Sequence, residues 1–178
     1  RAEDLLLIIN EDGTLKTITP ELSTHFNELP IVIERWIKRK PITLVYYNQN
    51  KKEYFIKRFI IENKKNELSF LKDDGKLIFV TTEWRPVIKI QFKKNRGEVS
   101  NQEKIINVEE FIDIKGFKAS GNRLLTEKRY SKNKINKISL FESLPYEDDN
   151  KNKEIVELEA NEPETVSTSN KTQIKLKF

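Results

Sequence analysis

Short apolar runs separated by polar residues recur along most of the chain. They are rich in β-branched and aromatic residues, a composition typical of β-strands. Candidate strands lie at residues 5–9, 15–18, 42–47, 53–61, 67–71, 76–82, 87–92, 111–114, 123–128 and 134–141. Because helical periodicity is weak by comparison, the pattern predicts an all-β fold.

Two Asp-Gly pairs, Asp12-Gly13 and Asp74-Gly75, lie between candidate strands and favour tight hairpin turns. A strand, a glycine-containing turn and a lysine-bearing return strand recur at 5–18, at 68–80 and, in a variant form, at 111–126. Repeated units of several strands are typical of propeller-like blades, so the pattern favours a blade architecture.

The C-terminal part of the chain differs from the rest. From Phe141 onward nine acidic residues stand against five lysines, so this part carries a net charge of −4, and residues 1–140 carry +9 within a total of +5. Residues 142–178 are polar and lack glycine, and most of them offer too little apolar surface to offset the entropy of ordering. We expect a β domain at 1–141 and a largely disordered acidic tail at 142–178.

The net positive charge of the β domain suggests a polyanionic partner. The chain has no cysteine, which excludes disulfides and thiolate metal sites and fits a reducing compartment such as the cytoplasm. It has no apolar run near the roughly 20 residues that span a bilayer, so no membrane partner is expected.

Catalytic signatures are missing from the sequence. His25 is the only histidine, and no G-x-S-x-G, P-loop or G-x-G-x-x-G motif is present. The acidic pairs at 73–74 and 148–149 fall in a turn and in the tail, where solvated carboxylates are common. We expect no catalytic residue and no metal site in this chain.

Basic residues gather along three candidate strands and their exits, which points to contacts with nucleic acid. Lys and Arg on one outer surface bind phosphates without reading sequence, and salt weakens such contacts. The candidate DNA-binding residues are Lys57, Arg58, Lys89, Lys93, Lys94, Arg96, Lys115, Lys118 and Arg123. The alternative is a solvated, lysine-rich surface, and charge alone does not separate the two.

The stretch "KGFKASGNR" (115–123) places two of the five glycines, Gly116 and Gly121, among three of these cations. Glycine permits backbone geometry that other residues avoid. The pair therefore predicts a tight sheet corner that presents Lys115, Lys118 and Arg123 on the outside.

Several segments together resemble one known family. They are "LLLIINEDGTLKTITPELSTHF" (5–26), "TTEWRPVIKIQF" (81–92), "NVEEFIDIKGFKASGNRLLTEK" (107–128) and "ISLFESLPYEDD" (138–149). In this order they resemble the C-terminal region of the A subunit of bacterial topoisomerase IV and gyrase, in the form found in Bacteroidetes-type bacteria. The resemblance covers roughly residues 3–146.

The resemblance implies a partial β-pinwheel of about three blades, in which propeller-like blades of antiparallel strands exchange strands with their neighbours. It also implies a non-catalytic domain that binds and bends double-stranded DNA on a basic outer rim. In the whole ATP-dependent type IIA enzyme this rim would serve decatenation and relaxation.

The same resemblance implies the other partners. They would be the B subunit and a second A subunit, reached through an N-terminal part that precedes this sequence. ATP and Mg²⁺ would act in the holoenzyme, chiefly in the B subunit, and this fragment would hold no cofactor.

The gyrase hallmark "QRRGGKG" is absent from these 178 residues, which favours topoisomerase IV over gyrase. A propeller-like protein-interaction module that binds an acidic partner stays the alternative function. Weak salt dependence together with peptide selectivity would favour that alternative.

Overall fold

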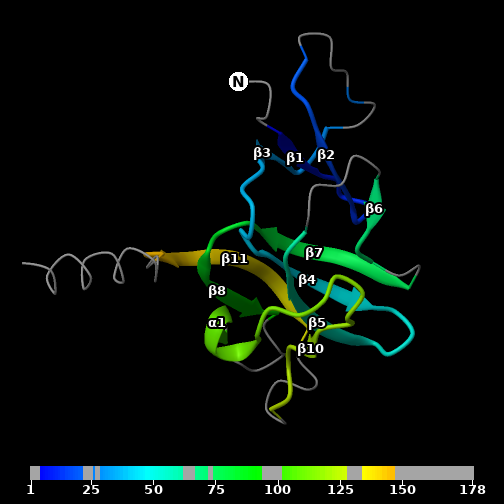
Figure 1. Cartoon of the computed structure of the whole chain (residues 1–178). Helices are drawn as coiled ribbons and strands as arrows, with labels where there is room; N and C mark the ends of the chain where they lie inside the picture. The colour runs from blue at the N-terminus through cyan, green and yellow to red at the C-terminus, as the bar shows by residue number, and fades with distance from the viewer. Residues whose placement is uncertain are drawn as a thin grey trace, which may run out of the picture. The chain divides into compact units, whose positions relative to one another are not determined.

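The computed structural model of the chain describes residues 5–21, 26, 29–61, 67–71, 74–93, 102–127 and 134–146. These residues form eleven strands and one short helix (Figure 1). The elements are β1 (Leu6–Ile9), β2 (Thr14–Ile18), β3 (Val32–Arg35), β4 (Ile42–Asn48), β5 (Glu53–Phe59), β6 (Leu68–Ser69), β7 (Gly75–Thr81), β8 (Arg85–Phe92), β9 (Glu103–Asn107), α1 (Val108–Phe111), β10 (Asn122–Arg123) and β11 (Ile135–Leu144). The predicted all-β class is confirmed.

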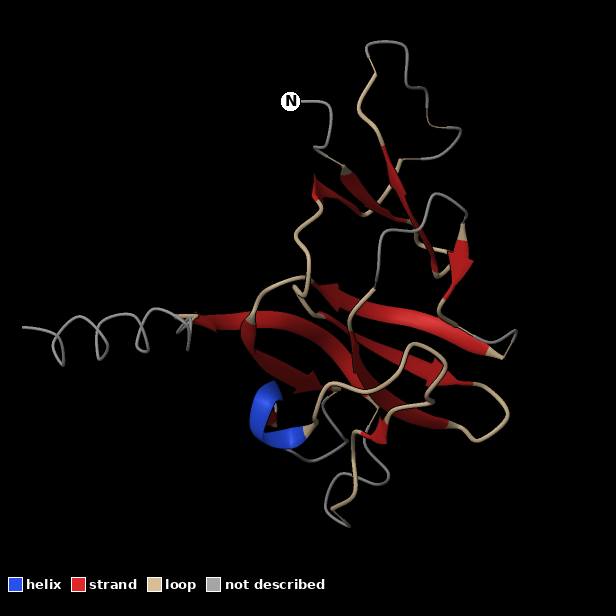
Figure 2. Ribbon diagram, viewed as in Figure 1, coloured by secondary structure: helices blue, strands red, loops and turns tan. Residues whose placement is uncertain are grey.

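The strands, red in Figure 2, form three antiparallel sheets. The first sheet has the order β3-β1-β2-β6, the second β7-β4-β5-β10 and the third β11-β8-β9. In each sheet a leading hairpin is joined by a later strand on the side of its first member. β6 and β10 are exchanged strands, because each follows the hairpin of the next sheet yet pairs with the preceding sheet.

The predicted repeat is therefore partly wrong. The hairpin at 5–18 exists as β1–β2, but its equivalents are β4–β5 and β8–β9 rather than the segments at 68–80 and 111–126. Asp74-Gly75 closes no hairpin, since β6 pairs in the first sheet and β7 in the second. Instead, the Asp74 carbonyl accepts a hydrogen bond from the Gln49 amide at 2.8 Å.

The turn predicted at Asp12-Gly13 is confirmed. Gly13 has a φ of +86°, a conformation that side chains with a Cβ rarely adopt. The Asp12 carboxylate accepts a hydrogen bond from the Thr14 amide at 2.9 Å, and the Asn10 amide donates to the Thr14 carbonyl at 2.9 Å. Hydrogen bonds among residues 10–14 close this hairpin, and the Gly13 carbonyl accepts a further one from the Phe70 amide at 2.9 Å.

The buried residues form two hydrophobic cores, and the second sheet contributes to both. One face of β4 and β5 packs Leu44 and Phe59 with residues of the first sheet such as Leu15. The opposite face packs Ile56 with residues of the third sheet such as Ile88. Because both faces are covered, β4 is buried at every residue but Tyr47 and does not alternate between apolar and polar positions.

The strand expected at 111–114 is wrong. The chain forms one helical turn, α1, whose N-terminal cap is Asn107: its side-chain oxygen accepts a hydrogen bond from the Glu109 amide at 3.2 Å. Val108 and Ile112 are buried in the core between the second and third sheets. Of the strand expected at 123–128, only Arg123 lies in a strand, β10, and residue 128 lies outside the described residues.

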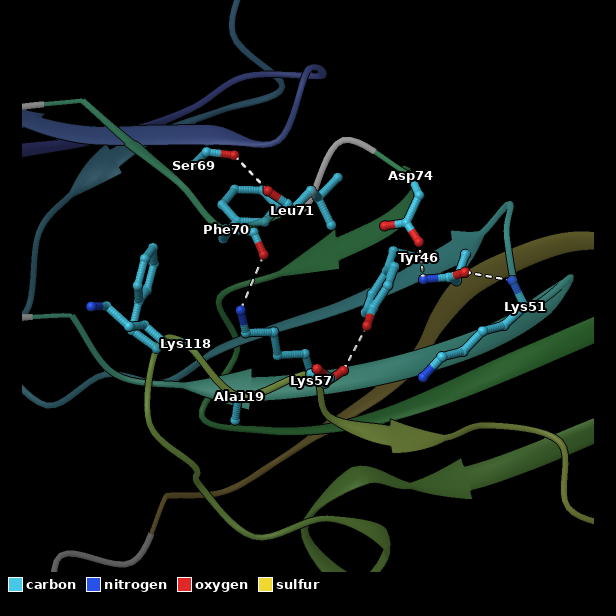
Figure 3. Close-up of a pocket in the computed structure, with 12 residues that line it drawn as sticks. Tyr46, Lys51, Lys57, Ser69, Phe70, Leu71, Asp74, Lys118 and Ala119 are labelled. Atoms are coloured by element: carbon cyan, nitrogen blue, oxygen red, sulfur yellow. Dashed lines mark hydrogen bonds between the residues drawn. The ribbon is translucent and has the colours of Figure 1, made fainter.

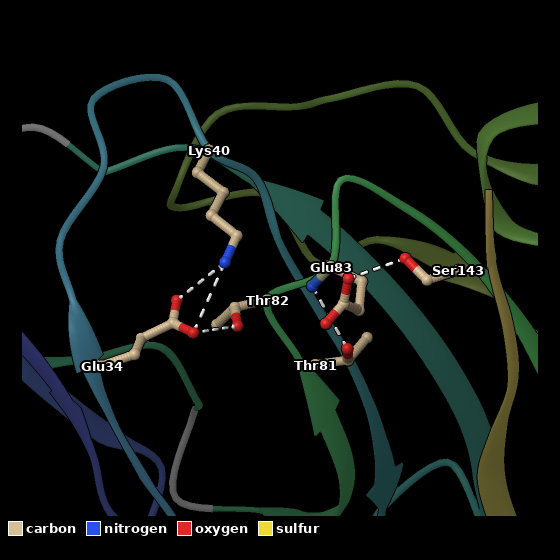
Figure 4. Close-up of polar contacts among 6 residues, drawn as sticks. All are labelled: Glu34, Lys40, Thr81, Thr82, Glu83 and Ser143. Carbon is tan, nitrogen blue, oxygen red and sulfur yellow. Dashed lines mark hydrogen bonds and ion pairs between the residues drawn. The ribbon is translucent and has the colours of Figure 1, made fainter. Parts of the chain in front are cut away.

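Polar side chains join the three sheets at one end (Figure 4). The Glu34 carboxylate of β3 accepts hydrogen bonds from Lys40 Nζ at 3.2 Å and from Thr82 Oγ1 at 2.8 Å. Ser143 of β11 donates to the Glu83 carboxylate at 2.7 Å. Residues that follow β7 thus contact both neighbouring sheets.

The compact β unit extends through Pro145, and β11 runs past the predicted boundary at 141. Of the predicted tail, residues 147–178 lie outside the described part of the chain, so its disorder stays a prediction. Within the described residues, the only helix has four residues and is too short to cross a membrane.

Candidate nucleic-acid interface

Lys57 lies in β5, a strand with a neighbour on each side and a core against each face. Its side chain is 4% exposed, and Nζ donates a hydrogen bond to the Phe70 carbonyl at 3.0 Å. The ammonium also lies 5.1 Å and 5.2 Å from the ring centroids of Phe59 and Phe117. Its expected place on an outer surface is wrong, and its contacts are those of a structural residue.

Arg58 faces the other side of β5 and is also 4% exposed. It donates one hydrogen bond to the Trp84 carbonyl at 2.9 Å, while Nε has no partner among the described residues. Burial lowers the pKa of Arg58, against the opposing effect of the Glu109 and Asp113 carboxylates. Its predicted position on an outer surface is therefore wrong as well.

The segment 115–123 crosses the edge of β5. The Lys115 amide donates to the Arg58 carbonyl at 2.9 Å, and β10 pairs with β5. Gly121 has a φ of +83°, and a Cβ there would lie 2.1 Å from the Ile56 carbonyl oxygen. The crossing thus requires glycine at 121. Gly116 has open space around it, so the predicted glycine role is confirmed for only one of the pair.

The three cations of this segment are exposed, as the sequence predicts. Lys115 Nζ donates to the Asn122 side-chain oxygen at 2.6 Å. Arg123 forms an ion pair with Glu53 at 3.0 Å while its side chain stays 57% exposed. Lys118 has no ion-pair partner among the described residues. Water and counterions therefore reach all three groups.

The third sheet holds the remaining candidates. Lys89 is half-buried, forms an ion pair with Glu103 at 3.6 Å and lies 4.7 Å from the Phe141 ring centroid. Lys93 is exposed, and its amide donates to the Lys134 carbonyl at 2.8 Å. Lys94 and Arg96 lie outside the described residues. A hydrogen bond from Gln91, more than the charge of Lys89, lowers the pKa of Glu103.

Other exposed cations also lack a carboxylate partner within the described part of the chain. They are Lys38, Arg39, Lys51, Lys52, Lys76, Lys134 and Lys137. Arg39 and Lys52 occupy turns with positive φ, +67° and +55°. The polar turn "NQNKK" is a sequence signal for two of them, because hairpin tips project into solvent.

Four cations gather where the strands of the second sheet end. Lys51 and Lys52 form the β4–β5 turn, and Lys76 pairs with Tyr47 near the start of β7. Arg123 pairs with Phe55 on the far side of the same hairpin. We call Lys51, Lys52, Lys76 and Arg123 the hairpin-end cations. They supply several positive charges on neighbouring strands, as a phosphate backbone requires.

No group of three His, Cys, Asp or Glu side chains suited to a metal ion occurs among the described residues. The family model for topoisomerase C-terminal domains of Bacteroidota matches residues 1–142. The chain belongs to this family.

The family match runs from the start of the chain into β11 and includes all three hairpins. It confirms the resemblance drawn from the sequence segments. No curated protein and no solved structure matched the chain in the corresponding searches.

Proposed function

We propose that this topoisomerase C-terminal domain binds and bends double-stranded DNA through the phosphate backbone. Exposed cations without carboxylate partners, several of them on neighbouring strands, carry this proposal. Backbone contacts of this kind position DNA without reading its sequence. The family match supports DNA as the polyanion, because topoisomerases act on DNA.

The contact set that we propose changes the sequence-based one. Lys93, Lys115, Lys118 and Arg123 stay in it, together with Lys94 and Arg96, and the hairpin-end cations join it. Lys57 and Arg58 leave it, because burial and carbonyl hydrogen bonds occupy them. Lys89 takes a lesser part, since it is half-buried and Glu103 already offsets its charge. Arg123 has a carboxylate partner too, but it stays in the set because its side chain is 57% exposed.

The exchanged strands β6 and β10 support a β-pinwheel, with the three sheets as blades and the cations on its outer rim. We place the domain in the A subunit of a type IIA topoisomerase, topoisomerase IV rather than gyrase, in the cytoplasm. The B subunit and a second A subunit would be its partners. ATP and Mg²⁺ would act in those other parts of the enzyme.

The test is binding of the 178-residue chain to a random-sequence duplex across a salt series. Log affinity should fall steeply with log salt, by about 0.9 for each phosphate neutralised. The triple variant Lys115→Gln, Lys118→Gln and Arg123→Gln should bind more weakly, and its slope should be shallower by about 2 to 3.

The matched control is the triple variant Lys16→Gln, Lys40→Gln and Lys104→Gln. It removes the same net charge, but each of these lysines is only partly exposed and has a carboxylate partner, Glu67, Glu34 and Glu127 respectively. If both triple variants lost the same duplex affinity, the effect would depend only on net charge, and the proposed binding surface would be contradicted. Bending is measured separately, by energy transfer between dyes on the two ends of the duplex, which should rise on binding. Unchanged energy transfer would contradict the proposal that the domain bends DNA.

A further inference from the structure

A pocket among the described residues is lined by Lys51, one of the hairpin-end cations (Figure 3). It has a volume of about 370 Å³ and opens between β4, β5, residues 69–71 and the loop 117–120. Small-molecule sites in proteins commonly occupy roughly 300–1,000 Å³. The pocket is therefore large enough for a ligand of mononucleotide size.

Flat rings form part of its wall. Tyr46 and Phe70 are buried, and Phe117 is half-buried at the loop. The Tyr46 ring stacks on Phe55 at a centroid distance of 5.5 Å, and its hydroxyl donates to the Ser120 carbonyl at 2.7 Å. These contacts hold the wall in place before any ligand arrives, which lowers the entropic cost of binding a flat group.

Three lysines line the same pocket. Lys57 lies within it, with its ammonium directed at the Phe70 carbonyl, while Lys51 and Lys118 stand on either side of it (Figure 3). The Lys118 ammonium points away from Lys57 in this view. It is an exposed side chain, so rotation about its flexible stem can bring its charge to a bound anion.

Asp74 is the only carboxylate among the described residues of the lining. One of its oxygens accepts hydrogen bonds from the side-chain amides of Asn48 at 2.7 Å and Asn50 at 3.1 Å. Its charge is thus partly compensated, and these lining residues include three lysines against one carboxylate. Its other oxygen can accept from an amino group, which nucleobases carry.

We propose that this pocket binds a nucleoside monophosphate unit. The base would lie against the aromatic wall, with its amino group toward Asp74, and the phosphate would lie between Lys51 and Lys118. The ligand comes either as a free nucleotide or as the phosphorylated end of a DNA strand. Lys51 and Lys118 also belong to the proposed duplex contacts, but the pocket proposal adds the aromatic wall and Asp74 and does not depend on duplex binding.

The experiment is a titration of the full 178-residue chain with 2′-deoxyadenosine 5′-monophosphate, followed by calorimetry and by amide chemical shifts. Binding should saturate, with shifts at Tyr46 and at residues 117–120. Lys51→Ala and Lys118→Ala should each weaken it by roughly 3- to 10-fold, the effect of losing one charge-assisted contact.

Two matched controls lie next to the tested lysines. Lys52→Ala and Lys115→Ala also remove exposed charges, but these do not line the pocket, and each should change the affinity less than about 2-fold. Inorganic phosphate alone and deoxyadenosine alone should bind at least about 10-fold more weakly than the nucleotide. No saturable binding, equal loss in all four variants, or phosphate binding as tight as the nucleotide would overturn the proposal.

A competition experiment distinguishes the two possible ligands, the free nucleotide and the phosphorylated end of a DNA strand. A 5′-phosphorylated single strand that displaces the nucleotide, where its unphosphorylated twin does not, identifies a strand end as the ligand. Nucleotide binding that neither strand disturbs identifies the free nucleotide. Duplex affinity is measured on the same samples: if the duplex binds and the nucleotide does not, the pocket proposal fails alone.

Discussion

Two adjacent basic regions of this domain, β5 and the segment 115–123 that crosses it, have opposite environments. Lys57 and Arg58 of β5 are each 4% exposed, whereas the Arg123 side chain, on the crossing segment, is 57% exposed. The strand has a core on both faces, while the segment covers one edge of that strand and leaves its own outer side to solvent. A cluster of basic residues in sequence thus says little about which charges can meet a phosphate.

The two regions also differ in what their charges do for stability. A buried ammonium loses its water, and its stability depends on compensating contacts with carbonyls and aromatic faces. An exposed cation keeps its water and contributes little, even when it is paired. We therefore expect mutations in β5 to change the free energy of unfolding, and mutations in the segment to change binding.

The largest effect should come from Gly121→Ala, which acts where the two regions meet. The new Cβ would lie 2.1 Å from the Ile56 carbonyl oxygen, and the φ of +83° disfavours any side chain. The free energy of unfolding should fall by about 3 kcal/mol or more, measured by chemical denaturation. Gly116→Ala is the control, since its Cβ meets open space; a similar loss there would contradict the crossing geometry.

Lys57→Ala should come next, with a loss of about 2–4 kcal/mol, because the Phe70 carbonyl loses its donor and two rings lose their cation. Lys57→Met keeps most of the stem volume and should cost less. The exposed Lys51→Ala should stay within about 0.5 kcal/mol. Equal costs at positions 57 and 51, in the same denaturation assay, would erase the distinction between the two regions.

Arg123→Ala should separate stability from binding. Its ion pair with Glu53 is exposed, and such pairs contribute about 0–1 kcal/mol. Thermal unfolding should therefore shift little, while the salt slope for duplex binding falls by about 0.9. A large loss of stability with unchanged DNA binding would show that Arg123 has a structural role, like Lys57 and Arg58.

The smallest effect concerns the third sheet, where Lys89 is half-buried and stands between the two cases. Gln91→Ala should raise the pKa of Glu103 toward its ordinary value, because the hydrogen bond from Gln91 is the main cause that lowers it. Lys89→Met should also raise this pKa, because it removes both the charge and the hydrogen bond of Lys89. Carboxyl chemical shifts across a pH titration measure both changes, and an unchanged pKa in Gln91→Ala would contradict the expectation.

A pKa that is lowered in the folded state stabilises the protein above the ordinary carboxyl pKa. That contribution is lost as pH falls through the lowered value. Gln91→Ala should therefore make unfolding slightly less sensitive to acid in this range. A steeper acid dependence in the variant would contradict this expectation.

Local sequence patterns predicted much of the secondary structure. The Asp12-Gly13 turn and the strands around 42–47 and 87–92 follow from residues close in the chain, since β-branched residues favour strands and glycine permits a positive φ. The strand predicted at 111–114 was wrong because Asn107 caps a helical turn just before it. Propensity at single residues did not reveal that cap.

The sequence by itself determined the all-β class, the first hairpin and the family. Only the tertiary structure decided that β6 and β10 join the preceding sheets and that Lys57 and Arg58 are buried. The physical reason is range. A turn is closed by neighbours in the chain, whereas pairing and burial depend on which distant segment covers each edge and face, and Arg58, for example, is buried by contacts from Trp84 and the segment at 115.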